Sequence, residues 1–195
     1  MSNLMDYLDW RGDLTFREAP FNEVDNLILA QLVYVEFAGI VPAPGEEGTI
    51  TVKEACELFF AAHDRKEIME RVSMTKTAAF VLEKMAQTER FCNAQLFGYI
   101  NDISKEEQSQ FSVVCVRLDD KSIYVSFSGT DNTIVGWREN FNMGYLSETP
   151  GQLKAVDYLN HMVKEDWKKI RVGGHSKGGN LSVYASVKCD RNIQK

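Results

Sequence analysis

The sequence has few cysteines, and their spacing matches neither a metal site nor a disulfide framework. The four lie far apart and form no C-x-x-C pair: Cys56, Cys92, Cys115 and Cys189. Structural zinc sites are recognised by closely spaced Cys and His ligands, and disulfide frameworks by small secreted chains. We therefore expect no metal and no cofactor, and reduced thiols in the cytoplasm.

Positive charge is also in short supply. The formal net charge is -6 at pH 7, and no run of five or more basic residues occurs. Because an acidic surface repels a phosphate backbone, nucleic acid is not an expected partner.

No hydrophobic stretch reaches the roughly 20 residues that a membrane-spanning helix needs. The most hydrophobic stretch, Leu27–Val41, is shorter and includes Gln31 and Glu36, so we interpret it as a buried helix. Residues 1–16 carry four charged side chains and no continuous hydrophobic run, unlike a signal peptide. We expect a cytoplasmic protein without a membrane span.

Length and composition are those of one ordinary globular domain. The chain has 195 residues, of which 44% are hydrophobic and 26% charged. This length supplies a substantial core but is short for two domains. We expect a single domain over residues 1–195, with a helical N-terminal region (1–90) and a sheet region (94–190).

The first ninety residues show helical patterns. Asn22 can cap a helix that has Asp25 in its first turn, and Thr51 with Glu54 forms a capping-box pattern. A third helix is predicted over 76–87. The Pro and Gly residues at 42–45 predict a loop between the first two helices.

Strand patterns begin near Ala94. Residues 96–103, 111–118, 122–127 and 170–173 are predicted strands, with a tight turn at Asp119–Lys121. Helices are predicted over 152–167 and 181–187. Helices and strands alternate in this half, so the predicted fold class is α/β.

The pentapeptide Gly174-His175-Ser176-Lys177-Gly178 has the G-x-S-x-G pattern of a nucleophile elbow. Such an elbow holds a serine exposed on a sharp strand-to-helix turn, and small residues two positions away prevent clashes. The pattern arises by chance in about one chain of this size in fifteen. Here a hydrophobic strand precedes it and a helix-forming segment follows, which favours Ser176 as a catalytic nucleophile.

Two other interpretations of these glycines stay open. A glycine-rich turn before a helix can bind a phosphate, and it can be merely structural. The order of lysine, serine and glycine does not match the Walker pattern, and the dinucleotide pattern G-x-G-x-x-G is absent.

A serine hydrolase needs two backbone N–H groups directed at the developing oxyanion. The residue after the nucleophile, Lys177, supplies one of them. The sequence Phe127-Ser128-Gly129-Thr130 ends a neighbouring strand, so Thr130 is the candidate for the other.

The segments Ser122–Tyr145 and Val172–Asn180 together resemble the class 3 lipases of the α/β-hydrolase superfamily. The shared features are a strand ending in Gly-Thr, a tryptophan (Trp137) and G-H-S-x-G. The resemblance implies that Thr130 supplies an oxyanion N–H. The chain has Ser128 where that family usually has arginine, and Lys177 where it usually has leucine, which weakens the expectation of triglyceride substrates.

Over its whole length the chain is similar to a bacterial family of lipase-like proteins of unknown function. The shared motifs are W-R-G-D-L (Trp10–Leu14), P-F-N-E-V-D (Pro20–Asp25) and G-H-S-K-G-G-N (Gly174–Asn180). This resemblance implies a hydrolase fold and no particular substrate.

A histidine base is missing where this fold would place it. The triad order is serine, acid, histidine, yet none of the nineteen residues after Ser176 is histidine, and Asp190 is the sole carboxylate there. His175, His161 and His63 are expected to be structural or surface residues. We therefore expect a sheet truncated after the nucleophile helix, whose strand 170–173 is left at an edge that favours self-association.

Two functions from different classes are consistent with these observations. The first is a serine esterase or lipase that forms an acyl-enzyme on Ser176 with a small-molecule acyl ester, its acid and histidine lying outside these residues. The second is a catalytically silent α/β-hydrolase scaffold that acts as a binding module. By itself, the 195-residue chain is expected to be inactive.

Overall fold

The computed structural model describes residues 3–70, 75–131, 133–163, 167 and 169–194. In these residues, eight helices and five strands form a mixed α/β structure, which confirms the predicted class. The helices are α1 (Leu4–Arg11), α2 (Glu23–Leu32), α3 (Val52–Ala62), α4 (Arg65–Glu70), α5 (Ala78–Ala86), α6 (Ile134–Asn142), α7 (Pro150–Met162) and α8 (Lys177–Lys188). The strands are β1 (Ile50–Thr51), β2 (Gln95–Ser104), β3 (Ser109–Arg117), β4 (Ser122–Phe127) and β5 (Lys169–Gly174).

The strands form one sheet in the order β1-β2-β3-β4-β5. The first three pairings are antiparallel, whereas β4 and β5 are parallel, with Phe127 opposite Gly174. Parallel neighbours need a crossover connection. Helices α6 and α7 lie in that crossover, so the carboxyl ends of β4 and β5 meet at the same end of the sheet.

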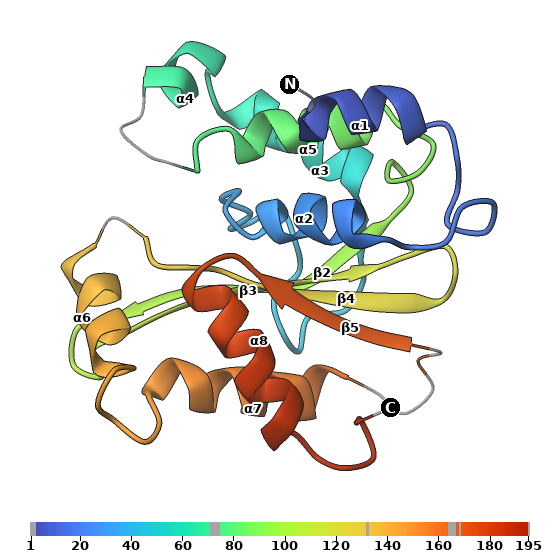
Figure 1. Ribbon diagram of the computed structural model, residues 1–195. Coiled ribbons are helices and arrows are strands. Elements are labelled where there is room, and N and C mark those ends of the chain that lie inside the picture. The colour runs from blue at the N-terminus through green and yellow to red at the C-terminus, as the bar shows by residue number, and fades with distance from the viewer. Residues whose placement is uncertain (1–2, 71–74, 132, 164–166, 168, 195) are drawn as a thin grey trace.

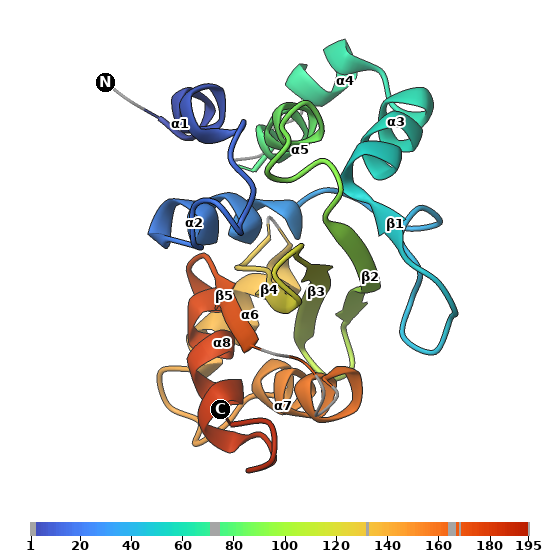
Figure 2. The same ribbon diagram turned by 90° about the vertical axis from the view of Figure 1, so that its right-hand side faces the viewer.

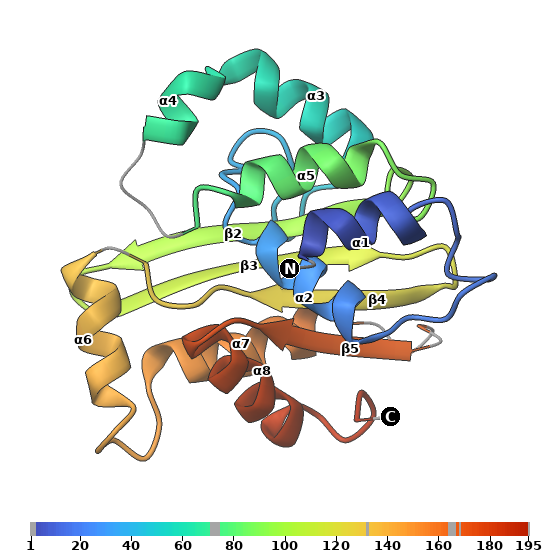
Figure 3. The same ribbon diagram turned by 45° about the horizontal axis from the view of Figure 1, so that its top comes forward.

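Helices cover both faces of the sheet. Helices α1 to α5 lie on one face and α7 and α8 on the other (Figures 1 and 2). Helix α6 lies beyond the end of the strands (Figure 3). Alternate residues of β3 therefore enter different cores: Val114 packs under the N-terminal helices, and Val113 packs against α7 and α8. All six residues of β4 are buried for this reason.

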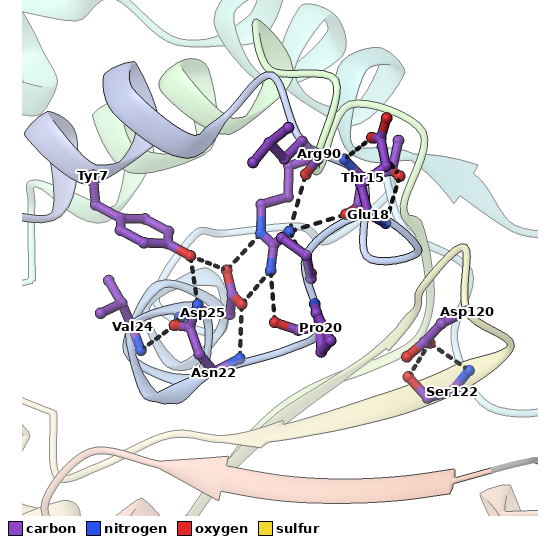
Figure 4. Close-up of polar contacts among 12 residues, drawn as sticks. Tyr7, Thr15, Glu18, Pro20, Asn22, Val24, Asp25, Arg90, Asp120 and Ser122 are labelled. Atoms are coloured by element: carbon purple, nitrogen blue, oxygen red, sulfur yellow. Dashed lines mark hydrogen bonds and ion pairs between the residues drawn. The ribbon is translucent and has the colours of Figure 1, made fainter.

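The N-terminal helical layer is held together by local caps and one buried ion pair. Asn22 and Asp25 form the capping box of α2, and the same Asp25 carboxylate pairs with Arg90 (Figure 4). The Thr51–Glu54 capping box likewise starts α3. Both predicted helix starts are confirmed, because a capping box is a local signal that needs no tertiary partner.

Some predicted boundaries were wrong. The helix predicted over 152–167 is α7, which ends at Met162; residues 164–166 lie outside the described residues. Trp167 is not helical and stacks on Phe97 with ring centroids 6.3 Å apart. The interpretation of the first ninety residues as helical missed the short strand β1, which pairs with β2.

The strand predicted at 170–173 lies at the edge of the sheet, as expected. It is part of β5, whose partner among the described residues is β4. Self-association through this edge stays a prediction. In the described part of the chain, no helix has the length and hydrophobicity required to cross a bilayer.

Candidate active site

Ser176 occupies a strained turn between β5 and α8. Its backbone has φ 58° and ψ -122°, and α8 begins at the next residue. A non-glycine residue rarely adopts positive φ, and such strain often occurs at functional sites. The serine is exposed. The predicted exposed position of Ser176 on a strand-to-helix turn is therefore confirmed.

The two flanking glycines are required by close backbone contacts. A Cβ atom on Gly174 would lie 2.3 Å from the Phe127 carbonyl oxygen, and one on Gly178 would lie 2.1 Å from the same atom. No side chain fits at such distances from a backbone oxygen. The end of β4 thus packs directly against the elbow, Gly174–Gly178, and the G-x-S-x-G spacing follows from that contact.

Residues Ser128–Thr130, here called the oxyanion loop, follow β4 and lie against the elbow. A Cβ atom on Gly129 would be 2.6 Å from the His175 carbonyl oxygen and 3.3 Å from Ser176 Cβ. The Gly129 N–H donates to the hydroxyl of Tyr34, at 2.8 Å. That the Thr130 N–H faces the Ser176 hydroxyl stays a prediction, although the loop that carries it is beside the serine.

The side chain of Lys177 is fully buried, so only its backbone is available to the exposed side of Ser176. The first N–H groups of a helix have no intrahelical acceptor, and Lys177 is the first residue of α8. Its ammonium group donates to Glu139 Oε2 at 2.6 Å, to Gln110 Oε1 at 2.8 Å and to the Gln110 carbonyl oxygen. All three ammonium protons therefore have acceptors.

The partners of Lys177 connect several elements around the elbow. Glu139, on α6, also accepts from the N–H of Gln110 at 3.1 Å and from the N–H of Gly151 at 2.8 Å. The Gln110 side chain donates to Ser128 Oγ at 3.1 Å. Burial lowers the pKa of Lys177, and the Glu139 carboxylate opposes this shift. The network joins β3, α6, α7, α8 and the oxyanion loop.

This network explains the two positions, Lys177 and Ser128, at which the sequence departs from the class 3 lipase pattern. The side chain of Lys177 is buried among protein groups and does not line the exposed face of Ser176. Its charge is therefore no argument against hydrophobic substrates. Ser128 is also buried, where its hydroxyl accepts from Gln110. Trp137, by contrast, is 54% exposed on α6.

The three histidines have different surroundings. His63 stacks on Phe59 in the N-terminal layer, and its Nδ1 lies 2.9 Å from the Phe59 carbonyl oxygen. His161 is exposed near the end of α7, and its Nδ1 lies 2.7 Å from the Asp157 carbonyl oxygen. His175 is exposed within the elbow. Among the described residues, no group of three or more His, Cys, Asp or Glu side chains could hold a metal ion.

Sequence reasoning missed three residues of this region: Tyr34, Gln110 and Glu139. They come from α2's C-terminal side, β3 and α6, and contact the site only through the tertiary fold. No local pattern in the sequence identifies them, because the burial of the Lys177 ammonium beside Glu139 depends on the tertiary fold.

Comparison with known proteins gives one match. The family model described as Mbeg1-like matches residues 85–195, a range that includes the oxyanion loop and the elbow. No curated protein and no solved structure matches the chain. The assignment to the class 3 lipases is thereby corrected, because the matching family is a different one. Since its model covers more than half of the sequence, the chain belongs to the Mbeg1-like family.

Proposed function

We propose that the protein is a serine hydrolase with an α/β-hydrolase fold, and that it cleaves a carboxylic ester through an acyl-enzyme on Ser176. The observation that carries the proposal is the conformation of Ser176: exposed, at φ 58°, between a parallel strand and a helix. A strained serine in this position is what the nucleophile elbow requires.

The surrounding backbone supports the same proposal. The β4–crossover–β5–elbow–α8 order matches the arrangement in which an α/β-hydrolase presents its nucleophile at the carboxyl end of the sheet. The oxyanion loop follows the neighbouring strand, and a Cβ added at its Gly129 would lie 3.3 Å from Ser176 Cβ. The Lys177–Glu139 pair fixes the start of α8, whose first N–H is the proposed oxyanion donor.

In the proposed reaction, Ser176 Oγ forms a bond to the ester carbonyl carbon while its proton passes to a general base. The N–H groups of Lys177 and Thr130 stabilise the negative charge on the carbonyl oxygen. Collapse of the intermediate breaks the bond to the alcohol, which leaves with the proton. Water then cleaves the acyl-enzyme by the same steps. We propose that the base and its acid lie outside these residues, because His63 stacks on Phe59 in the N-terminal layer and His175 and His161 are expected to be structural or surface residues.

The surroundings of the histidines also favour a second candidate, a catalytically silent scaffold that binds a ligand or a protein. His63 stacks on Phe59, and His161 Nδ1 lies 2.7 Å from the Asp157 carbonyl oxygen of its own helix, so neither is paired with a carboxylate as a triad base is. A scaffold would keep the elbow as a structural turn without turnover.

The test is ester hydrolysis by the full-length protein and its Ser176→Ala variant. On short p-nitrophenyl esters, the variant is expected to lose about 10⁴-fold or more in kcat. Ser186→Ala is a matched control, because Ser186 lies on α8, the helix that Ser176 precedes, and its hydroxyl donates to the Ser182 carbonyl oxygen of that helix. Ser176→Ala activity within tenfold of the wild type would contradict the proposal, and a wild type without turnover would favour the scaffold.

A further inference from the structure

Tyr34 brings a side-chain hydroxyl from the N-terminal layer to the oxyanion loop. It lies two residues after α2, in the part of the chain that precedes the family match. Its hydroxyl is 2.8 Å from the N–H of Gly129, the central residue of the loop. The two residues are separated by more than ninety positions in sequence, so the contact depends on α2 packing over β4 and β5.

The Tyr34 hydroxyl and Ser176 face the same side of Gly129. A Cβ atom at Gly129 would lie 2.6 Å from the Tyr34 hydroxyl oxygen and 3.3 Å from Ser176 Cβ. The 2.6 Å contact leaves no room for a side chain at Gly129, so the phenol, Gly129 and Ser176 pack closely together. The Tyr34 hydroxyl is therefore a side-chain donor close to the serine.

The Tyr34 hydroxyl has a proton that it can donate to a ligand beside Ser176. A phenol can accept and donate at once, and Tyr34 accepts from Gly129. Among the described residues, no acceptor for its proton is found. Burial raises the pKa of Tyr34, so the group stays protonated throughout the neutral range.

We propose that Tyr34 belongs to the oxyanion site of the proposed hydrolase, where its oxygen fixes Gly129 and its O–H binds the substrate's carbonyl oxygen. Because the Gly129 N–H donates to Tyr34, the next N–H of the loop, that of Thr130, is the proposed backbone donor to the substrate. The N-terminal layer then completes the active site as well as covering the sheet. This inference rests on the proposed function of Ser176.

The test compares Tyr34→Phe with Tyr99→Phe in the full-length protein. Each variant keeps its ring and loses one hydroxyl; that of Tyr99 bonds to Glu36 at 3.1 Å and lies on β2, away from β4. Because one oxyanion donor contributes about 10²- to 10³-fold, Tyr34→Phe is expected to lower kcat about 10²-fold with little change in KM. Affinity for an alkyl boronic acid, which mimics the tetrahedral intermediate, should fall in proportion. Tyr99→Phe should change neither.

The outcomes separate this inference from the proposed function. An active wild type with an equally active Tyr34→Phe variant would overturn the role of Tyr34 alone. Equal losses in Tyr34→Phe and Tyr99→Phe, with equal falls in melting temperature, would show a structural role and overturn it as well. A wild type that neither hydrolyses esters nor binds the boronic acid would overturn both proposals together.

Discussion

Two fully buried ion pairs, one in each half of the molecule, use the same interaction for different purposes. Arg90 pairs with Asp25 in the N-terminal layer, and Lys177 pairs with Glu139 beneath the elbow. Exposure of all four side chains is 1% or less. Burying charges is costly, so a pair of this kind is poor evidence for stability and better evidence that a particular geometry is fixed.

The two cations, Arg90 and Lys177, differ in the groups to which they donate hydrogen bonds. The guanidinium of Arg90 presents a planar fork of five donors, which bind the Asp25 carboxylate and the carbonyl oxygens of Leu14, Thr15 and Ala19 (Figure 4). It therefore orders a loop that has no regular structure. The compact ammonium of Lys177 binds Gln110 and Glu139, both next to the site. The first pair orders a connection, and the second positions the start of α8, next to Ser176.

The largest effect on stability is expected from Asp25→Ala. It leaves Arg90 buried without its anion and removes the acceptor of the Asn22 N–H at the cap of α2. Breaking a buried pair costs about 3–5 kcal/mol, and we expect the upper part of that range. Urea titration measures the change in the free energy of unfolding. Below the unfolding transition, Ser176 reactivity should be unchanged; a selective loss would show that this pair also serves the site.

Lys177→Met should lower stability less than Asp25→Ala does, and it should lower the reactivity of Ser176 more. Methionine fills a similar volume, and Glu139 keeps the N–H donors of Gln110 and Gly151. We therefore expect the lower part of the same range, about 3 kcal/mol. Because α8 and the oxyanion loop lose their shared anchor, the rate of Ser176 labelling by a fluorophosphonate should fall in the folded protein. An unchanged labelling rate would make this pair purely structural, like that of Arg90.

The ion pair of Arg65 with Glu83 is partly exposed to solvent, and it extends the comparison to a pair that contributes little to stability. The hydrogen bond from Arg65 lowers the pKa of Glu83. The pair therefore stabilises the folded state above the ordinary carboxyl pKa, and this stabilisation is lost as the pH falls through the lowered pKa. Glu83→Gln should give the smallest loss of stability in this series, shrinking as the solution is acidified. Urea titrations at several pH values measure it; a difference that grew toward acid pH would contradict the assignment.

The sequence predicted what depends on neighbouring residues. The capping boxes of Asn22–Asp25 and Thr51–Glu54 and the elbow at Ser176 are each complete within a few positions, and the structure contains all three. The partners of Lys177 and the contact of Tyr34 with Gly129 are not local. They arise from crossing elements in three dimensions, and no spacing rule connects such residues.

The central claim, that Ser176 is an activated nucleophile, is tested most directly by covalent labelling. The full-length protein is treated with a fluorophosphonate, digested and analysed by mass spectrometry. The account predicts a single adduct on the peptide containing Ser176, absent from Ser176→Ala and retained in Ser186→Ala. An adduct on another residue, or no adduct on a folded wild type, would contradict it.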